Sequence, residues 1–193
     1  MGRLVNMRNP LTGEPFSDRT LWYPIYDTVS QGTAITAGKA YTYFATVQSA
    51  SKALNLTNMT QAGTLPLSWG MTVLKLGIEW NPDIAELDAE HYAKDVTFEL
   101  SIDGTKVIEA PVSALPSGFG LTGLAAGTGT PSALMINNGP AAPQATEVIT
   151  PPIEIIGGAS IVGTMRHHAA ITLGAAVLPR VYLWGFLDQA ITN

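Results

Sequence analysis

Residues 96–110 read VTFELSIDGTKVIEA, and they are the clearest evidence of the fold class. Apolar side chains occupy every second position of the first seven residues, with polar side chains between them. This is the pattern of a strand that is buried on one face. Asp103-Gly104 follows directly, a dipeptide preferred in two-residue hairpin turns because both turn positions need a positive φ. We therefore expect a β-hairpin whose second strand occupies residues 106–110.

Similar alternation recurs on both sides of this hairpin. On the stretch 71–80, one predicted face carries Thr72, Leu74, Leu76, Ile78 and Trp80. About eight strands are expected in all, over residues 41–47, 71–80, 96–102, 106–110, 147–156, 161–166, 169–173 and 178–187. Several are separated by loops instead of tight turns, which fits an all-β, single jelly-roll β-sandwich with two four-stranded sheets. One short helix, capped by Asn81 with Pro82 at its first position, is expected to run to about Ala93 as an insertion in a loop.

The chain divides into a predicted arm and a predicted domain. Residues 1–40 are polar and irregular, with repeated Pro and Gly, and we expect an extended N-terminal arm. Residues 41–193 are expected to form the jelly-roll domain, since one β-sandwich often reaches about 200 residues. Residues 114–146 are rich in Gly, Pro, Ala and Thr without periodicity, and a connection of this length usually serves a function or an interface.

The composition favours a subunit that hides much of its surface. Charged residues make up 13% of the chain and hydrophobic residues 46%, whereas about 25% charged is usual. A compact, Ala- and Gly-rich domain is the alternative explanation, but depletion of charge is typical of interface cores. The net charge is −5 and the basic residues are scattered singly, so no direct nucleic-acid binding is expected. No apolar run is long enough to span a membrane, and synthesis in a host cytoplasm is expected.

Aromatic residues define the candidate interface. The expected strand at 178–187 is apolar on both faces, although a strand of an antiparallel sheet normally shows one face to water. We expect it to be central or covered by another subunit. Residues 22–26 read WYPIY, which suggests an anchor from the arm that docks into a groove, because aromatic residues dominate interface energetics. The candidate interface residues are Trp22, Tyr23, Tyr26, Tyr182, Trp184 and Phe186.

No pattern of catalytic residues is present, and we expect neither an enzyme nor a cofactor. Residues 118–123 match G-x-G-x-x-G, but a dinucleotide site needs a strand before this motif and a helix after it. His167 and His168 are adjacent, so on a strand they point to opposite faces and would share a metal only at a bend, even with Glu154 nearby. No metal site is therefore assigned, and a cupin-like metalloprotein is the weakest alternative.

The order of several segments resembles a known family. These segments are NMTQAGTLP at 58–66, PVSALPSGFG at 111–120, NGP at 138–140, PIEI at 152–155 and RVYLWG at 180–185. Over about residues 40–188, their layout is similar to that of the small single jelly-roll capsid proteins of tail-less icosahedral viruses. The nearest likeness is to the small major capsid protein of the membrane-containing Thermus phages and their haloarchaeal virus relatives. The likeness rests on order and loop composition.

The resemblance implies a structural protein of the virion. In this family, capsid shell subunits assemble into pseudo-hexameric capsomers together with a second, larger capsid protein, over an internal membrane. The family has no catalytic residues that could be assigned to positions in this chain. The expected partners are therefore further copies of this chain, a second capsid protein and an underlying viral membrane. A receptor- or carbohydrate-binding β-sandwich, such as a virion spike domain, is the alternative from a different functional class.

Overall fold

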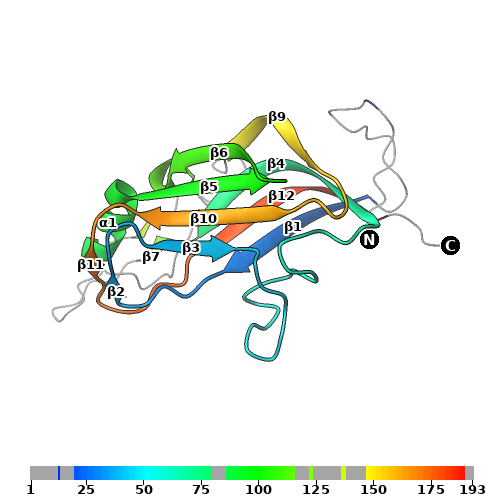
Figure 1. Cartoon of the computed structure of the whole chain (residues 1–193). Helices are drawn as coiled ribbons and strands as arrows, with labels where there is room; N and C mark the ends of the chain where they lie inside the picture. The colour runs from blue at the N-terminus through cyan, green and yellow to red at the C-terminus, as the bar shows by residue number, and fades with distance from the viewer. Residues whose placement is uncertain are drawn as a thin grey trace.

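Eight longer strands form two four-stranded antiparallel sheets that pack face to face, as Figure 1 shows. The structure is a computed structural model. It describes residues 13, 20–79, 86–115, 122–123, 136–137 and 147–189. The first sheet contains, in spatial order, β1 (Leu21–Thr28), β12 (Arg180–Gln189), β4 (Trp69–Glu79) and β9 (Glu147–Ile155). The second contains β3 (Ala40–Tyr43), β10 (Ile161–His167), β5 (Val96–Ile102) and β6 (Thr105–Pro111).

The connections carry the shorter elements. These are the strand pair β2 (Ala34–Ile35) and β11 (Ile171–Thr172), the pair β7 (Thr122–Gly123) and β8 (Ile136–Asn137), the helix α1 (Glu86–Asp95) and the 3-10 turn η1 (Val112–Ala114). Figure 1 shows α1, β2 and β11 together at one end of the sandwich. The hairpin turn between β5 and β6 lies at the other end, where Ser160 N–H donates to Asp103 Oδ1 at 2.7 Å. No described helix has the length and apolar character needed to cross a bilayer.

The strand order identifies the fold as a single jelly roll. When the eight longer strands are numbered along the chain, the first sheet has the order 1-8-3-6 and the second 2-7-4-5. Strands that are distant in the sequence thus become neighbours, as two interlocked Greek keys require. The expected class, an all-β jelly-roll sandwich with one short helix in a loop, is confirmed.

The hairpin on which the prediction rested forms as expected. Every second side chain of β5 is buried in the core, namely Val96, Phe98, Leu100 and Ile102. Asp103 and Gly104 have φ values of 49° and 73°, so both turn positions lie in the left-handed region that this dipeptide tolerates. Ile102 pairs directly with Thr105 across the turn.

The predicted arm boundary is wrong for residues 21–40. β1 pairs with β12 along its whole length, and Ile25 is buried in the core between the sheets. Pro24 and the mixed polarity of this segment concealed the strand. A proline is tolerated there because β1 lies at the edge of its sheet, where one row of N–H groups has no ladder partner to lose. Residues 1–12 and 14–19 of the predicted arm lie outside the described residues.

The predicted inner face of β4 is wrong at its start. Met71 and Val73 are buried in the core, whereas Thr72 and Leu74 were expected there. A β-bulge is the cause: Val73 pairs with Gly185 and Lys75 with Trp184, which leaves Leu74 as the extra residue. One inserted residue moves all preceding side chains to the opposite face.

The predicted helix is present, and its described part covers Glu86–Asp95. The side chain of Tyr92 on this helix is buried. The expected cap at Asn81 and Pro82 lies outside the described residues, as does most of the 114–146 connection.

Candidate self-association surface

Alternation along β1 and β12 places aromatic side chains on the outer face of the first sheet. The cross-strand pairs are Trp22–Phe186, Pro24–Trp184 and Tyr26–Tyr182. Residues between them, such as Ile25 and Leu183, are buried in the core, so these pairs must point away from the second sheet. Five of the six predicted interface residues therefore lie together.

These five residues, Trp22, Tyr26, Tyr182, Trp184 and Phe186, form what we call the aromatic ladder. The Trp22 ring stacks on Trp184 with centroids 6.2 Å apart and meets Phe186 edge-on at 5.3 Å. Tyr182 stacks on Trp184 at 6.2 Å and contacts Tyr26 at 5.8 Å. Such ring pairs each contribute about 0.5–1.5 kcal/mol beyond the burial of their area. Trp22 is 45% exposed and Tyr26 and Trp184 are partly exposed, whereas Tyr182 and Phe186 are buried beneath them, so Trp22 is the part of the ladder most open to solvent.

Tyr23 does not belong to this surface. It pairs with Gly185 and packs against the core, on the side of β1 opposite to Trp22. The prediction grouped all the aromatic residues of 22–26 as an anchor in a neighbour's groove. Because they form a strand, adjacent side chains separate to opposite faces.

A polar cluster closes one end of the ladder. Arg180 donates from Nη1 to Glu79 Oε2 at 3.2 Å and to the Tyr182 hydroxyl at 3.0 Å, and its Nε donates to Thr28 Oγ1 at 2.9 Å. The Tyr182 hydroxyl in turn donates to Glu79 Oε2 at 2.5 Å. Burial, together with this hydrogen bond to a carboxylate, raises the pKa of Tyr182 well above its usual value. The phenol thus stays protonated and keeps donating at every physiological pH.

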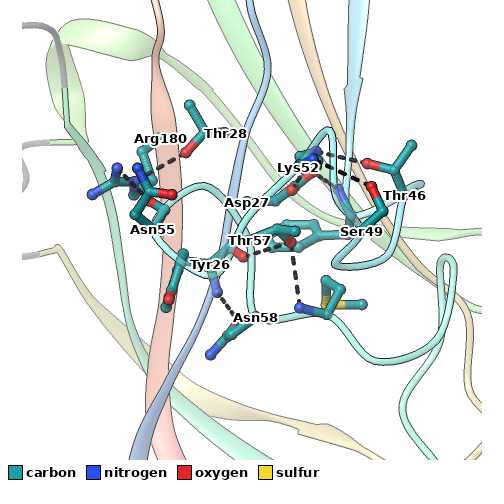
Figure 2. Close-up of polar contacts among 12 residues, drawn as sticks. Tyr26, Asp27, Thr28, Thr46, Ser49, Lys52, Asn55, Thr57, Asn58 and Arg180 are labelled. Carbon is teal, nitrogen blue, oxygen red and sulfur yellow. Dashed lines mark hydrogen bonds and ion pairs between the residues drawn. The ribbon is translucent and has the colours of Figure 1, made fainter.

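The long loop between β3 and β4 covers the edge of β1. Asn58 donates from Nδ2 to the Pro24 carbonyl at 2.6 Å and accepts the Tyr26 N–H at Oδ1 at 2.9 Å. Its side-chain amide therefore occupies the place of a peptide group in a neighbouring strand. Thr57 Oγ1 also donates to the Tyr26 carbonyl, at 3.2 Å. Figure 2 shows Asn58 and Thr57 lying along this part of the strand.

A buried ion pair fastens the same loop to β1. Asp27 is 1% exposed, and its Oδ1 lies 2.6 Å from Nζ of Lys52, as Figure 2 shows. Asp27 Oδ2 accepts the N–H of Phe44 at 2.7 Å. Phe44 has a φ of 66°, which is rare for a bulky residue and is stable only where its surroundings enforce it. The loop is thus held in one conformation beside the ladder.

The outer face of the second sheet has a different chemistry. Lys106 lies 2.9 Å from both Glu99 Oε2 and Glu109 Oε2. Val162 points outward from β10 and is 37% exposed. Other outward-facing or exposed residues of this sheet are Thr97, Ser101, Thr164 and Arg166. This is the composition of a face that remains in contact with water.

The histidines do not form the metal site that was considered. His167 is fully buried, whereas the neighbouring His168 is bonded at Nε2 to Thr97 Oγ1 at 2.8 Å, so the two rings diverge as expected for a strand. His167 Nδ1 lies 2.9 Å from Nε2 of His91. Glu154 is on β9, in the other sheet. Within the described ranges no three His, Asp or Glu side chains are grouped closely enough to hold a metal.

Several polar residues beside these sites were missed by the sequence reasoning. Arg180 could have been found, since it shares the two-residue period of Tyr182 and Trp184. Asp27 with Lys52, and His91 with His167, could not, because only the folded topology brings them together. The G-x-G-x-x-G match at 118–123, which was not assigned to a dinucleotide site, lies mostly outside the described residues. Comparison of the chain with protein-family models, curated proteins and solved structures finds no match.

Proposed function

We propose that this protein is a structural capsid shell subunit that associates with copies of itself through the aromatic ladder. The observation that carries the proposal is the gathering of five aromatic side chains on the outer face of one sheet. Only 13% of the chain is charged, so there is little elsewhere on the protein to oppose association.

The chemistry of the ladder fits a protein contact. Trp, Tyr and Arg are the residues most enriched among those that dominate binding energy. Trp22 and Tyr26 supply rings, and Arg180 lies at the end of the same face, with its charge balanced by Glu79. Stacking on Trp184 and an edge-on contact with Phe186 hold Trp22 in place, so little side-chain entropy is lost when a partner covers it.

The structure of the β1 edge favours association through the outer face of the sheet over pairing of β1 with a strand of another copy. Pro24 has no N–H to offer a new strand, and Asn58 occupies the hydrogen-bonding groups of Pro24 and Tyr26. Natural edge strands are commonly protected by prolines and covering loops in this way. Copies would therefore meet by packing side chains.

The resemblance in sequence layout supplies the finer part of the proposal. It suggests pseudo-hexameric capsomers, a second capsid protein in the same lattice and an underlying viral membrane, with the protein located in the virion. The jelly roll supports this reading because it is a common architecture of capsid subunits, although lectins and cupins also use it. No catalytic role is proposed.

The test is the assembly state of the whole chain and of two matched variants. Electron microscopy and light scattering of the concentrated protein should show capsomers or shells. Trp22→Glu places a charge in the ladder and should shift assembly to at least ten-fold higher concentration. Val162→Glu, which adds the same charge to the other outer face, should assemble like the wild type.

Thermal unfolding must show both variants folded for this comparison. A stable monomer at high concentration, or equal assembly of the two variants, would refute the role of the ladder. The stacked Trp22 and Trp184 rings also favour a second candidate, stacking on the face of a sugar ring. A monomer whose Trp fluorescence is quenched saturably by a carbohydrate would establish that function in place of the first.

A further inference from the structure

Two histidines that are distant in the sequence meet inside the end of the sandwich that carries α1. His91 on α1 and His167 at the end of β10 stack with ring centroids 5.2 Å apart. Nε2 of His91 lies 2.9 Å from Nδ1 of His167. His167 is fully buried and His91 is 6% exposed, so water cannot take the place of either partner.

The side chain of Gln31 determines which nitrogen carries each proton. Gln31 Nε2 lies 3.1 Å from the sulfur of Met165, so its oxygen points the other way, 2.8 Å from Nε2 of His167. A carbonyl oxygen can only accept, and His167 therefore carries its proton on Nε2. In the neutral ring Nδ1 is then an acceptor, and His91 must donate to it.

His167 cannot gain a second proton without breaking this contact. Protonation at Nδ1 would set two N–H groups against each other across 2.9 Å. Burial, reinforced by the neighbouring His91 and His168, lowers the pKa of His167 to about 4. We propose that the His91–His167 pair is an acid-sensitive latch that holds α1 and its neighbouring loops on the end of the second sheet. This proposal does not depend on the proposed function.

Among the titratable groups around the pair, His167 is the one whose protonation breaks the contact. Asp95 Oδ2 lies 3.5 Å from Nδ1 of His91, the ring nitrogen that does not contact His167. The other titratable groups that face the pair or its immediate neighbours come from α1, from β3 and the residue before it, and from the residue after β10. They are Asp88, Tyr92, Lys39, Tyr41, Tyr43 and His168. Burial raises the pKa of Tyr43 and of Tyr92, so neither phenol ionises in this range.

The latch joins three segments of the chain. Gln31, in the connection between β1 and β3, exchanges backbone hydrogen bonds with Val177, in the connection between β10 and β12. The same second connection is tied to α1, because Asp88 Oδ2 accepts the N–H of Gly174 at 3.0 Å. Loss of the His91–His167 contact therefore loosens the whole end of the sandwich.

The direction of the pH effect follows from proton binding. Between pH 6.5 and about 4 the latched state keeps His167 neutral, whereas a free imidazole binds a proton. The opened state binds more protons, so acid favours opening by up to about ten-fold per pH unit below 6.5. At neutral pH the latch is fully closed.

Hydrogen exchange of the full chain tests the latch. After correction for intrinsic rates, the amides of residues 86–95 should lose roughly 100-fold of their protection between pH 7 and pH 4.5. In His91→Gln the new amide can rotate and offer an oxygen to protonated His167, so at least ten-fold less protection should be lost. His168→Gln, the matched control, alters an exposed neighbour that contributes less than burial and His91 to the lowered pKa of His167, so it should lose nearly as much protection as the wild type.

Proton NMR of the wild-type imidazoles supplies a second measurement that does not depend on any variant folding. His167 should titrate well below pH 6, together with the opening of α1. Equal protection of α1 at both pH values would overturn the proposal. A His167 midpoint near 6.5 with α1 unchanged, or loss of the acid response in His168→Gln alone, would overturn it as well.

Discussion

In both sheets of this sandwich, side chains alternate between the core and the outer face, but the two outer faces differ in chemistry. On β12 and β1, the side chains between the core positions are aromatic, with Trp22, Tyr182 and Trp184 in ring contact. On β5 and β6, they are charged or polar, with Lys106 between two glutamates. The core-facing positions of both sheets are mostly apolar. The two faces therefore differ in their outward positions, and this difference sets one face apart as the candidate contact.

The largest expected effect on the free energy of unfolding comes from the close packing around one glycine in each sheet. A Cβ at Gly185 would lie 1.9 Å from the carbonyl oxygen of Thr72, so only a backbone shift could accommodate it. At Gly163, in the other sheet, the nearest atoms belong to the side chains of Phe98 and Tyr43, at 3.1 Å. Gly185→Ala should lower the free energy of unfolding by about 4 kcal/mol or more, and Gly163→Ala by about 1 kcal/mol.

Urea unfolding of the two alanine variants measures this difference. Equal losses would mean that β12 and β4 do not approach each other at the bulge as described. Because the bulge also determines which residues of β4 face outward beside the ladder, such a result would weaken the assignment of that face.

Smaller effects on the free energy of unfolding are expected from replacing two lysines, Lys52 beside the aromatic ladder and Lys106 on the outer face of the second sheet. Lys52→Ala leaves Asp27 buried without its counter-ion and should lower the free energy of unfolding by about 2–3 kcal/mol, since Lys52 is itself 17% exposed. Lys106→Ala removes exposed ion pairs with Glu99 and Glu109 and should leave the free energy of unfolding nearly unchanged, because exposed pairs are screened by solvent.

Chemical denaturation at low and high salt measures the free energy of unfolding of both variants. The effect of Lys52→Ala should persist in high salt, because a buried pair is poorly screened, whereas that of Lys106→Ala should vanish. If Lys52→Ala proved as mild as Lys106→Ala, the loop beside the ladder would not be held by its ion pair.

The sequence revealed the parts of the fold that depend on local pattern. The hairpin at 96–110 was predictable because alternation and Asp103-Gly104 agree with each other. β1 was missed because Pro24 is normally a signal against a strand, and only its position at a sheet edge permits it. The outward face of β4 was assigned wrongly because a bulge at Leu74 leaves no mark in the alternation.

The candidate site was predictable in its residues but not in its geometry. Five of the six aromatic residues lie together because β1 and β12 pair, and this pairing joins segments about 160 residues apart. Tyr23 was included because the sequence was read there as an arm without alternation. The meeting of His91 and His167 required the contact between α1 and β10, which no local pattern predicts.

Hydroxyl-radical footprinting of Trp22 and Val162 tests most directly whether the aromatic ladder is the contact between copies. The two side chains are exposed by 45% and 37% on opposite outer faces, so they report on the two surfaces in one sample. Labelling of Trp22 should fall several-fold when dilute protein is concentrated into assemblies, with Val162 unchanged. Assemblies in which Trp22 is labelled as strongly as in the dilute protein would contradict the account.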